Sequence, residues 1–351
     1  MNALPFSPDL QPRRLPQPYL LFLGDTTEAG YAKTAFGLRD WAADRCLGEW
    51  SCGATVSTGL PMLTPKEAYA RGARGLVIGV ANAGGFIPAT WLASLVEALE
   101  AGLDLVSGMH MRLADMPQLS AAATRLGRCL VDIRTPPPNI PIATGHKRSG
   151  KRLLTVGTDC ALGKKYTALA LARALAARGV DADFRATGQT GILIAGAGIP
   201  LDAVVADFEA GAAEMLSPAA APGHWDVIEG QGSLFHPAYA GVSLGLLHGS
   251  QPDVFVVCHE PGRTHVLGHG EFALPAIEEV IALTIRLGRR TSPAIRCAGV
   301  SINTGALAPD LAVELCAEES RRLGLPVADP MRGGEAFRQL VDAVLSDRRE
   351  P

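Results

Sequence analysis

A glycine-rich stretch with two consecutive lysines, TVGTDCALGKKYTALALARAL (residues 155–175), has the residue types of a phosphate-binding loop. An apolar strand leads into it, and an Ala/Leu-rich helical pattern follows it. In such a loop the backbone N–H groups point into one concavity, and the positive end of the helix axis adds to them, so an anion is held without any side chain. The alternative is a glycine-rich turn that only begins a helix. Strand, spacing and lysine together favour a phosphate loop made of Gly157, Thr158, Asp159, Cys160, Ala161, Leu162, Gly163, Lys164 and Lys165.

The residue after the first lysine decides which ligand the loop suits. A nucleotide hydrolase has a Ser or Thr there, whose hydroxyl holds Mg²⁺, but this chain has Lys165, and an ammonium group cannot bind a metal. Thr167 lies two residues further on and is a poor substitute. We expect the loop to hold a diphosphate or phosphoadenosine group without breaking it. Coenzyme A carries such a group far from its reactive thioester, and we predict no metal site. Cys160 is not assigned as an acyl-carrying nucleophile, because only the lysines lie near it in sequence to activate it.

A second group of polar residues follows the apolar run at residues 225–228. That run predicts a strand, which delivers Glu229 to the C-terminal edge of a parallel sheet, where ligands bind. We predict Glu229 as a general base, with His236 as the second choice. The Gln231 side chain, or the backbone of residues 230–233, would donate hydrogen bonds to an oxyanion. The alternatives are a structurally paired carboxylate at Glu229 and an ordinary loop histidine at His236.

Candidate substrate contacts lie in the polar stretches around that strand. Arg263 suits a carboxylate, because a planar guanidinium grips one with two hydrogen bonds, and a surface ion pair is the alternative. Arg332 is the reserve for the same role. The stretch ATGQTG closes another strand and would place its Gln and its second Thr beside the phosphates or the substrate. The predicted substrate-binding residues are therefore Arg263, Gln189, Thr190 and Ser233.

These residues need strands and helices to position them, and short apolar runs alternate with Ala/Leu-rich helical patterns along the whole chain. That alternation predicts an α/β fold with parallel sheets. In the first half, PYLLFLGD, GLVIGV, LDLVSG and CLVDIR read as strands, but GVANAGG lacks the glycine spacing of a dinucleotide fingerprint. The proline-rich stretch TPPPNIPIATGHKRSGK breaks all periodicity. We predict a Rossmann-like domain over residues 1–140, a linker over 141–150 and a phosphate-loop α/β domain over 151–351.

The composition limits the class of partner. The length of 351 residues, 48% of them hydrophobic, favours two domains, and a net charge of -3 gives no attraction to nucleic acid or to an anionic membrane. Seven scattered cysteines without Cys-x-x-Cys pairs fit reduced thiols, and the N-terminus lacks the apolar run of a signal peptide. We expect a cytoplasmic protein that acts on small molecules, not on nucleic acid or membranes, and forms a homo-oligomer, as many such enzymes do.

The motifs together resemble known families. The loop GTDCALGKK is similar to that of dethiobiotin synthetase and related enzymes, which implies an adenine contact at Asn303, with Thr304 beside it. The stretches GVANAGG, LEAGLDLVSGMH, ATGQTGI, EGQGSLFHPAYAGVSLGLLHG and CHEPGRT resemble a family long catalogued as a domain of unknown function, some members of which are D-glutamate N-acetyltransferases. The resemblance covers nearly the whole chain. It implies transfer of an acetyl group from the co-substrate acetyl-CoA to the amine of D-glutamate.

Two other functions compete with acetyl transfer. The first is an ATP-dependent ligase or kinase of the dethiobiotin synthetase type, which would need ATP and Mg²⁺ and could use Asp207 and Glu229 as acidic ligands. Lys165 argues against this, because it removes the loop hydroxyl. The second is a coenzyme sensor without turnover, in which Glu229 and His236 could be replaced without loss.

Overall fold

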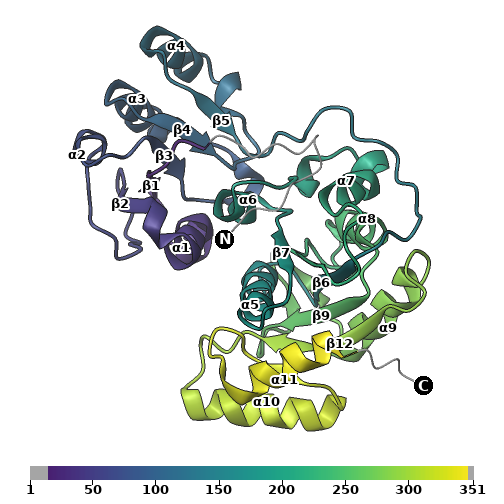
Figure 1. Cartoon of the computed structure of the whole chain (residues 1–351). Helices are drawn as coiled ribbons and strands as arrows, with labels where there is room; N and C mark the ends of the chain where they lie inside the picture. The colour runs from purple at the N-terminus through teal and green to yellow at the C-terminus, as the bar shows by residue number, and fades with distance from the viewer. Residues whose placement is uncertain (1–14, 347–351) are drawn as a thin grey trace. The chain divides into compact units, whose positions relative to one another are not determined.

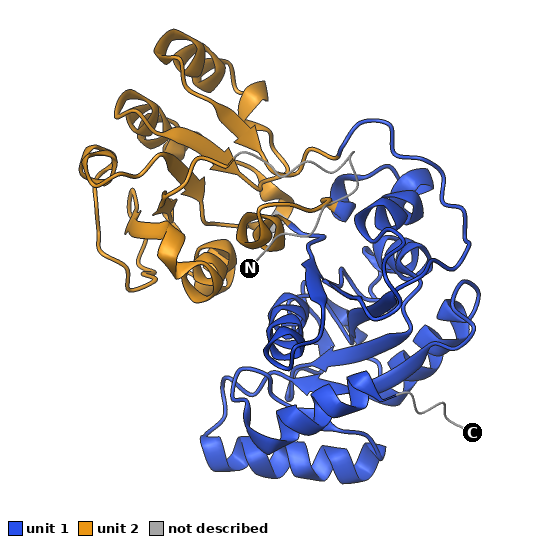
Figure 2. Ribbon diagram, in the orientation of Figure 1, with its two compact units in different colours: residues 1–11, 137–188, 201–351 blue, residues 12–136, 189–200 orange. Residues whose placement is uncertain are grey.

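The computed structural model describes residues 15–346, and its contacts divide them into two compact units. Unit 1 contains residues 137–188 and 201–346, and unit 2 contains residues 15–136 and 189–200, as the blue and orange ribbons of Figure 2 show. Each unit has its own sheet with helices packed against it (Figure 1). The predicted α/β class with parallel sheets is therefore confirmed. Among the described residues, no helix combines the length and the apolar character that a membrane crossing requires.

Unit 2 contains a five-stranded parallel sheet in the order β2-β1-β3-β4-β5. Its central strands YLLF and GLVI are buried along their whole length, because helices cover both faces of such a sheet. The strands are β1 (Tyr19–Phe22), β2 (Cys46–Trp50), β3 (Gly75–Ile78), β4 (Asp104–Ser107) and β5 (Leu130–Asp132). The helices are α1 (Lys33–Trp41), α2 (Pro65–Ala70), α3 (Leu92–Glu100), α4 (Pro117–Leu126) and α6 (Gln189–Ala195). The strand order reverses between β1 and β3, which is the switch point of an open α/β sheet.

Helix α6 joins unit 2 although it lies far along the chain. It packs against α1, where the Thr34 and Thr190 hydroxyls are hydrogen-bonded at 3.0 Å. The Arg45 guanidinium donates to the carbonyl of Ile194 at 2.9 Å. A Cβ on Gly108 would overlap the side chain of Gln189, so the glycine makes room for α6. Residues 189–200, which the sequence analysis placed in the second domain, thus belong by their contacts to unit 2.

Unit 1 contains a six-stranded parallel sheet in the order β13-β12-β9-β6-β8-β7, with α5 and α11 on one face and α8 and α9 on the other (Figure 1). The strands are β6 (Lys151–Gly157), β7 (Ala182–Arg185), β8 (Trp225–Ile228), β9 (Val254–His259), β12 (Arg296–Ile302) and β13 (Val327–Ala328). A separate antiparallel hairpin joins β10 (His265–Val266) to β11 (His269–Ala273). The helices are α5 (Lys164–Ala177), α7 (Glu209–Leu216), α8 (Ala240–Ser250), α9 (Ile277–Gly288), α10 (Pro309–Leu323) and α11 (Gly334–Leu345).

The order of these strands positions the candidate residues. Because β8 and β9 flank β6 in the sheet, the residues that follow them reach the same edge as the loop that follows β6. Apolar side chains of β6, β8, α5 and α11 form the core beneath that edge, among them Leu153, Leu171, Val227 and Leu340. The strands are thereby fixed, and the polar edge rests on a packed support.

A buried charge cluster lies near the start of β8. The Asp226 carboxylate accepts from Arg185 Nε at 2.5 Å and from Ser217 Oγ at 2.5 Å, and it lies 3.1 Å from His224 Nε2. The other ring nitrogen of His224 lies 3.0 Å from the carboxylate of Asp181. Hydrogen bonding to Asp226 raises the pKa of His224. The charged imidazolium therefore stabilises this part of unit 1.

The cluster predicts how stability depends on pH. The folded pKa of His224 lies above its unfolded value of about 6.5, so its contribution is complete below that pH and is lost as the pH rises through the folded pKa. We expect the urea concentration at the unfolding midpoint, followed by circular dichroism, to fall as the pH rises through the folded pKa of His224. The fall should be steeper for the wild type than for His224→Gln. The exposed variant His146→Gln should keep the wild-type slope. Equal slopes for wild type and His224→Gln would contradict the assignment.

Candidate phosphate-loop site

The loop between β6 and α5 presents the start of a helix that carries only positive charge. Gly163 caps α5 with φ of 107° and supplies no side-chain cap, and the first turn holds Lys164 and Lys165 but no acidic residue. The first N–H groups of a helix have no partner within it, and cations at this end oppose the helix dipole. A bound anion would satisfy the N–H groups and the two ammonium charges together. The local structure therefore favours an anion at the place where the sequence predicts one.

The first lysine of the loop is already buried. Lys164 Nζ donates to the carbonyl of Asp159 at 2.7 Å, and burial lowers the pKa of Lys164. Gly230 lies against this side chain, and a Cβ at that position would overlap the carbonyl of Thr155 and touch Lys164. The Gly230 N–H donates to Thr155 Oγ1 at 2.9 Å. Only glycine allows the backbone after β8 to approach the loop so closely.

The carboxylate of Asp159 ties the loop to the segment that follows β9. It is fully buried, and its Oδ2 accepts from the Leu267 N–H at 2.8 Å and from Arg263 Nη1 at 3.1 Å. Arg263 also donates to the Cys160 carbonyl at 2.9 Å and forms an ion pair with Glu260. The guanidinium thus holds the loop in place. Its predicted contact with a substrate carboxylate stays a prediction.

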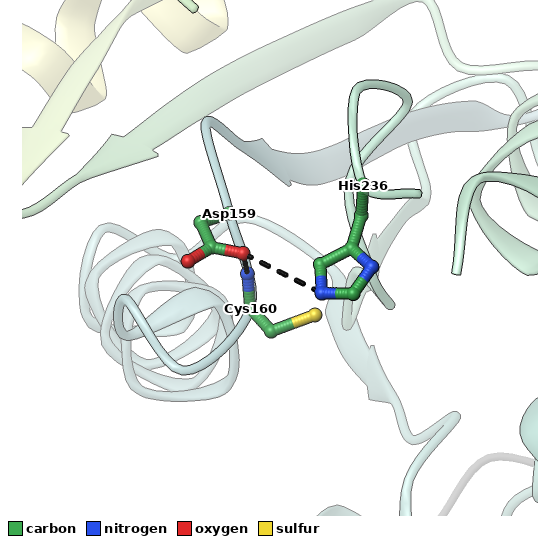
Figure 3. A group of neighbouring side chains, drawn as sticks. All are labelled: Asp159, Cys160 and His236. Carbon is green, nitrogen blue, oxygen red and sulfur yellow. Dashed lines mark hydrogen bonds and ion pairs between the residues drawn. The ribbon is translucent and has the colours of Figure 1, made fainter. Parts of the chain in front are cut away.

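His236 lies beside the loop with its ring orientation fixed (Figure 3). Its Nδ1 accepts from the backbone N–H groups of Ala238 at 3.1 Å and Tyr239 at 3.2 Å. An acceptor of two N–H groups carries no proton, so the neutral ring has its proton on Nε2. Burial lowers the pKa of His236, which favours this neutral form. His236 is therefore an N–H donor, and the role of second-choice base does not suit this tautomer.

Asp159, Cys160 and His236 form a group whose possible metal-ligand atoms lie within 4.8 Å of one another (Figure 3). His236 Nε2 faces Asp159 Oδ1 at 3.9 Å, which is longer than a hydrogen bond. A metal at Nε2 would require the proton to move to Nδ1, where two N–H donors already point. The Asp159 carboxylate is likewise occupied by Arg263 and backbone N–H groups. The donor set therefore does not suit a metal ion.

Glu229 lies at the C-terminal end of β8, as predicted, and is buried. Its Oε2 accepts from the N–H groups of Thr187 and Gly188, both at 3.0 Å. Burial raises the pKa of Glu229, while the charge of Lys165 and these two hydrogen bonds lower it. Gln231 Nε2 donates to Thr187 Oγ1 at 2.9 Å, so two of the three predicted catalytic side chains, Glu229 and Gln231, hold the same turn. The carboxylate is structurally paired, and its pKa is also displaced toward that of a general base.

The remaining predicted residues lie in different places. Gln189 and Thr190 belong to unit 2, in α6, whereas the loop belongs to unit 1. Ser233 Oγ donates to the Thr158 carbonyl at 3.2 Å and so contacts the loop. Asn303 follows β12 and is exposed, and its Oδ1 accepts from the Gly305 N–H at 3.2 Å.

Thr304 and Arg332 follow strands of the unit 1 sheet and contact each other. Thr304 is bound by Asp329 and by Arg332, whose Nε donates to Thr304 Oγ1 at 2.7 Å. That contact occupies the reserve arginine. Asp207, a ligand under the ATP-dependent alternative, is exposed.

Two functional contacts were not predicted from the sequence. Thr187 anchors Glu229 and Gln231 through its N–H and its hydroxyl, and Leu267 binds Asp159 through its N–H. Thr187 lies within ATGQTG, and its proximity to a recognised motif was the available signal. Leu267 gave none, because a backbone N–H is present at every non-proline residue.

Comparisons with known proteins agree with this architecture. Residues 43–136 match a family described as a domain of unknown function (DUF1611_N) Rossmann-like domain, and residues 141–340 match a domain of unknown function (DUF1611_C) P-loop domain. A crystal structure of a DUF1611 family protein from Anabaena variabilis superposes with a TM-score of 0.84 at 34% identity, covering 94% of this chain and 98% of that one.

Two relatives have names that describe an activity. A D-glutamate N-acetyltransferase from Tritonibacter scottomollicae is 51% identical over 93% of this chain and 98% of its own length. A D-glutamate N-acetyltransferase from Pseudoalteromonas sp. is 48% identical over 94% of this chain and 98% of its own length. The comparisons confirm the resemblance that the sequence motifs indicated.

The geometry of His236 predicts its tautomer in solution. We expect imidazole NMR of isotope-labelled protein to show His236 neutral at neutral pH, with its proton on Nε2. The signal is assigned by its loss in His236→Gln. A proton on Nδ1, or titration of the ring near neutral pH, would show that the two backbone hydrogen bonds do not hold the ring.

Proposed function

The chain belongs to the DUF1611 family, and on that premise we propose that it is an N-acetyltransferase that moves an acetyl group from acetyl-CoA to the amine of D-glutamate. The observation that carries the proposal is the identity of 51% and 48% to two relatives named for this activity, across nearly all of each chain. The loop supports it, because two lysines and an uncapped helix start suit the phosphates of a carrier. A cytoplasmic location and a homo-oligomer remain predictions.

Lys165, the second lysine of the loop, is the physical reason to propose acetyl-CoA as the ligand and not Mg-ATP. Lys165 lies close enough to Glu229 to lower its pKa, so an ammonium charge occupies the region where a nucleotide hydrolase keeps a metal and its acidic ligand. The phosphates of coenzyme A need neutralisation but no bond cleavage. We propose that Lys164, Lys165 and the loop N–H groups bind these phosphates, and that the His236 N–H adds a neutral donor.

Acetyl transfer requires a base, because the amine of an amino acid arrives protonated and then has no lone pair. In the proposed step the base removes one proton from the ammonium group, and the nitrogen attacks the thioester carbonyl. The tetrahedral intermediate then breaks its C–S bond, and the leaving thiolate of coenzyme A takes up the second proton that the nitrogen loses. We assign Glu229 this role, since burial raises its pKa and improves it as a base near neutral pH. Gln231, next to it in the same connection, is the proposed side-chain donor to the oxyanion.

The reaction is tested by thiol release. Purified protein is incubated with acetyl-CoA and a panel of D- and L-amino acids, free thiol is followed with a chromogenic thiol reagent, and N-acetyl products are identified by mass spectrometry. We expect thiol release with D-glutamate and equal amounts of N-acetyl-D-glutamate. The proposal is falsified if no amino acid in the panel releases thiol. Phosphate release from Mg-ATP in the same panel would instead support the ATP-dependent alternative.

Glu229→Gln separates a base from a structural anchor. The amide oxygen can still accept from Thr187 and Gly188, so the turn is kept, but the base is lost. We expect kcat to fall about 10²-fold to 10⁴-fold, with loss of the rise in rate as pH passes through the Glu229 pKa. The control Thr187→Val, which removes the hydroxyl contacts and leaves the carboxylate, should keep that pH profile. Wild-type kcat in Glu229→Gln would leave Glu229 only its anchoring role.

A further inference from the structure

A row of four rings borders the phosphate loop in unit 1. Tyr239 stacks on His236 with centroids 4.4 Å apart and planes at 29°. His236 meets the edge of His269 at 5.2 Å, and His269 meets Phe272 at 6.3 Å and 74°. Two of the rings come from the connection between β8 and α8, and two come from the hairpin of β10 and β11. The row therefore joins two separate segments of the chain over one surface.

The outer members of the row are exposed, while of its two inner members His236 is buried and His269 is half-buried. Tyr239 is 52% exposed and Phe272 is 45% exposed, and Leu267 at the tip of the hairpin is 56% exposed, whereas His236 is 2% exposed. Large apolar side chains gathered in one place on a surface mark a contact with another molecule more often than scattered ones do. The surface formed by Tyr239, Leu267, His269 and Phe272 is called the ring surface below.

The ring surface is attached to the loop itself. The Leu267 N–H donates to Asp159 Oδ2 at 2.8 Å, and Arg263, just before the hairpin, donates to the same oxygen at 3.1 Å. His236 lies 3.9 Å from the other oxygen of Asp159. The ring surface is therefore next to the loop, and a ligand whose phosphate is bound by the loop can extend toward it.

We propose that the ring surface is the subsite for the pantetheine arm of the acyl-CoA whose phosphates the loop binds. This inference rests on the proposed use of acetyl-CoA. The arm is a linear chain of methylene and methyl groups with two amides, so it needs an extended apolar surface with an occasional donor. The ring surface offers apolar contacts in Leu267 and in ring edges, and the imidazole of His269 carries an N–H donor.

The arrangement of the rings favours the arm over the adenine. A flat base stacks best on a free ring face, but Tyr239 already places one face on His236, and the other two contacts in the row are edge-on. The row is elongated, as a chain requires. Strand order also separates Tyr239 from Asn303: Asn303 follows β12, on the far side of β9 from the loop, and Tyr239 follows β8, on the other side of β6.

The test compares two probes on the full chain. Coenzyme A carries the arm, and adenosine 3′-phosphate 5′-diphosphate carries the adenine and the same phosphates without it. We expect the double variant Leu267→Ala, Phe272→Ala to weaken coenzyme A binding at least about fivefold in calorimetry, because two exposed apolar contacts are removed. Binding of the armless probe should be unchanged. Val313→Ala, which truncates a side chain that is 69% exposed on α10, should change neither affinity.

Each other outcome has a distinct meaning. Equal weakening of both probes would place the adenine on the ring surface, and no weakening of either would leave the surface without a role in binding; both results overturn the proposal. An altered oligomeric state in light scattering, with unchanged coenzyme A affinity, would make the surface an interface between copies of the chain. If the wild type binds coenzyme A no more tightly than the armless probe, the result supports the phosphate site and contradicts the arm subsite. If the wild type binds neither probe, the proposed acetyl donor itself is wrong.

Discussion

The polar edge of unit 1 depends on one buried carboxylate. Asp159 sits inside the loop and accepts hydrogen bonds from the loop backbone at Cys160, from the Arg263 guanidinium and from the hairpin at Leu267. A carboxylate with so many donors is stable without exposure to water, because each donor replaces part of its lost hydration. It fixes the shape of the loop and the position of the segment after β9 at the same time. The ammonium group of Lys164 binds the carbonyl of Asp159, so the side chain and the backbone of this residue both have partners within unit 1.

A second carboxylate organises the neighbouring connection in a similar way. Glu229 holds the N–H groups of Thr187 and Gly188, and Thr187 in turn holds Gln231. The chain re-enters unit 1 at Leu201 after residues 189–200, and it does so at the same turn, because the Leu201 N–H donates to the Thr187 carbonyl at 3.0 Å. Glu229 therefore has a structural role beside the catalytic role proposed for it, and a substitution there must preserve the acceptor if it is to report on chemistry alone.

Local pattern was sufficient to predict much of the fold. The strands at residues 19–22, 75–78, 104–107 and 151–157 are apolar runs, and α3 and α4 end near Gly102 and Gly127, both with positive φ. Strand β2 escaped prediction because CLGEW contains a glycine and a charged residue. Glu49 is buried there because Ser57 and Thr58, eight and nine residues later, donate to its carboxylate. Such a partner is fixed by the path of the chain and leaves no periodic signal.

The residues of the candidate site could be predicted from their types, but their hydrogen-bond partners could not. The loop, Glu229 and His236 could be named because glycines, lysines and polar residues follow apolar runs. The tautomer of His236 could not, because it depends on the orientation of two backbone N–H groups. The position of Arg263 on Asp159 likewise follows from a hairpin that folds back over the loop, a contact between residues 104 positions apart.

The excursion of residues 189–200 into unit 2 makes that unit discontinuous in the gene. A protein truncated within the proline-rich stretch would carry all five strands of the first sheet but no α6, leaving Thr34 without its hydroxyl partner and the space beside Gly108 unfilled. Conversely, the second half expressed alone would carry α6, most of whose side chains are buried in unit 2 in the full chain. Any attempt to exchange the two halves with those of a relative must therefore move this short insert together with the first sheet.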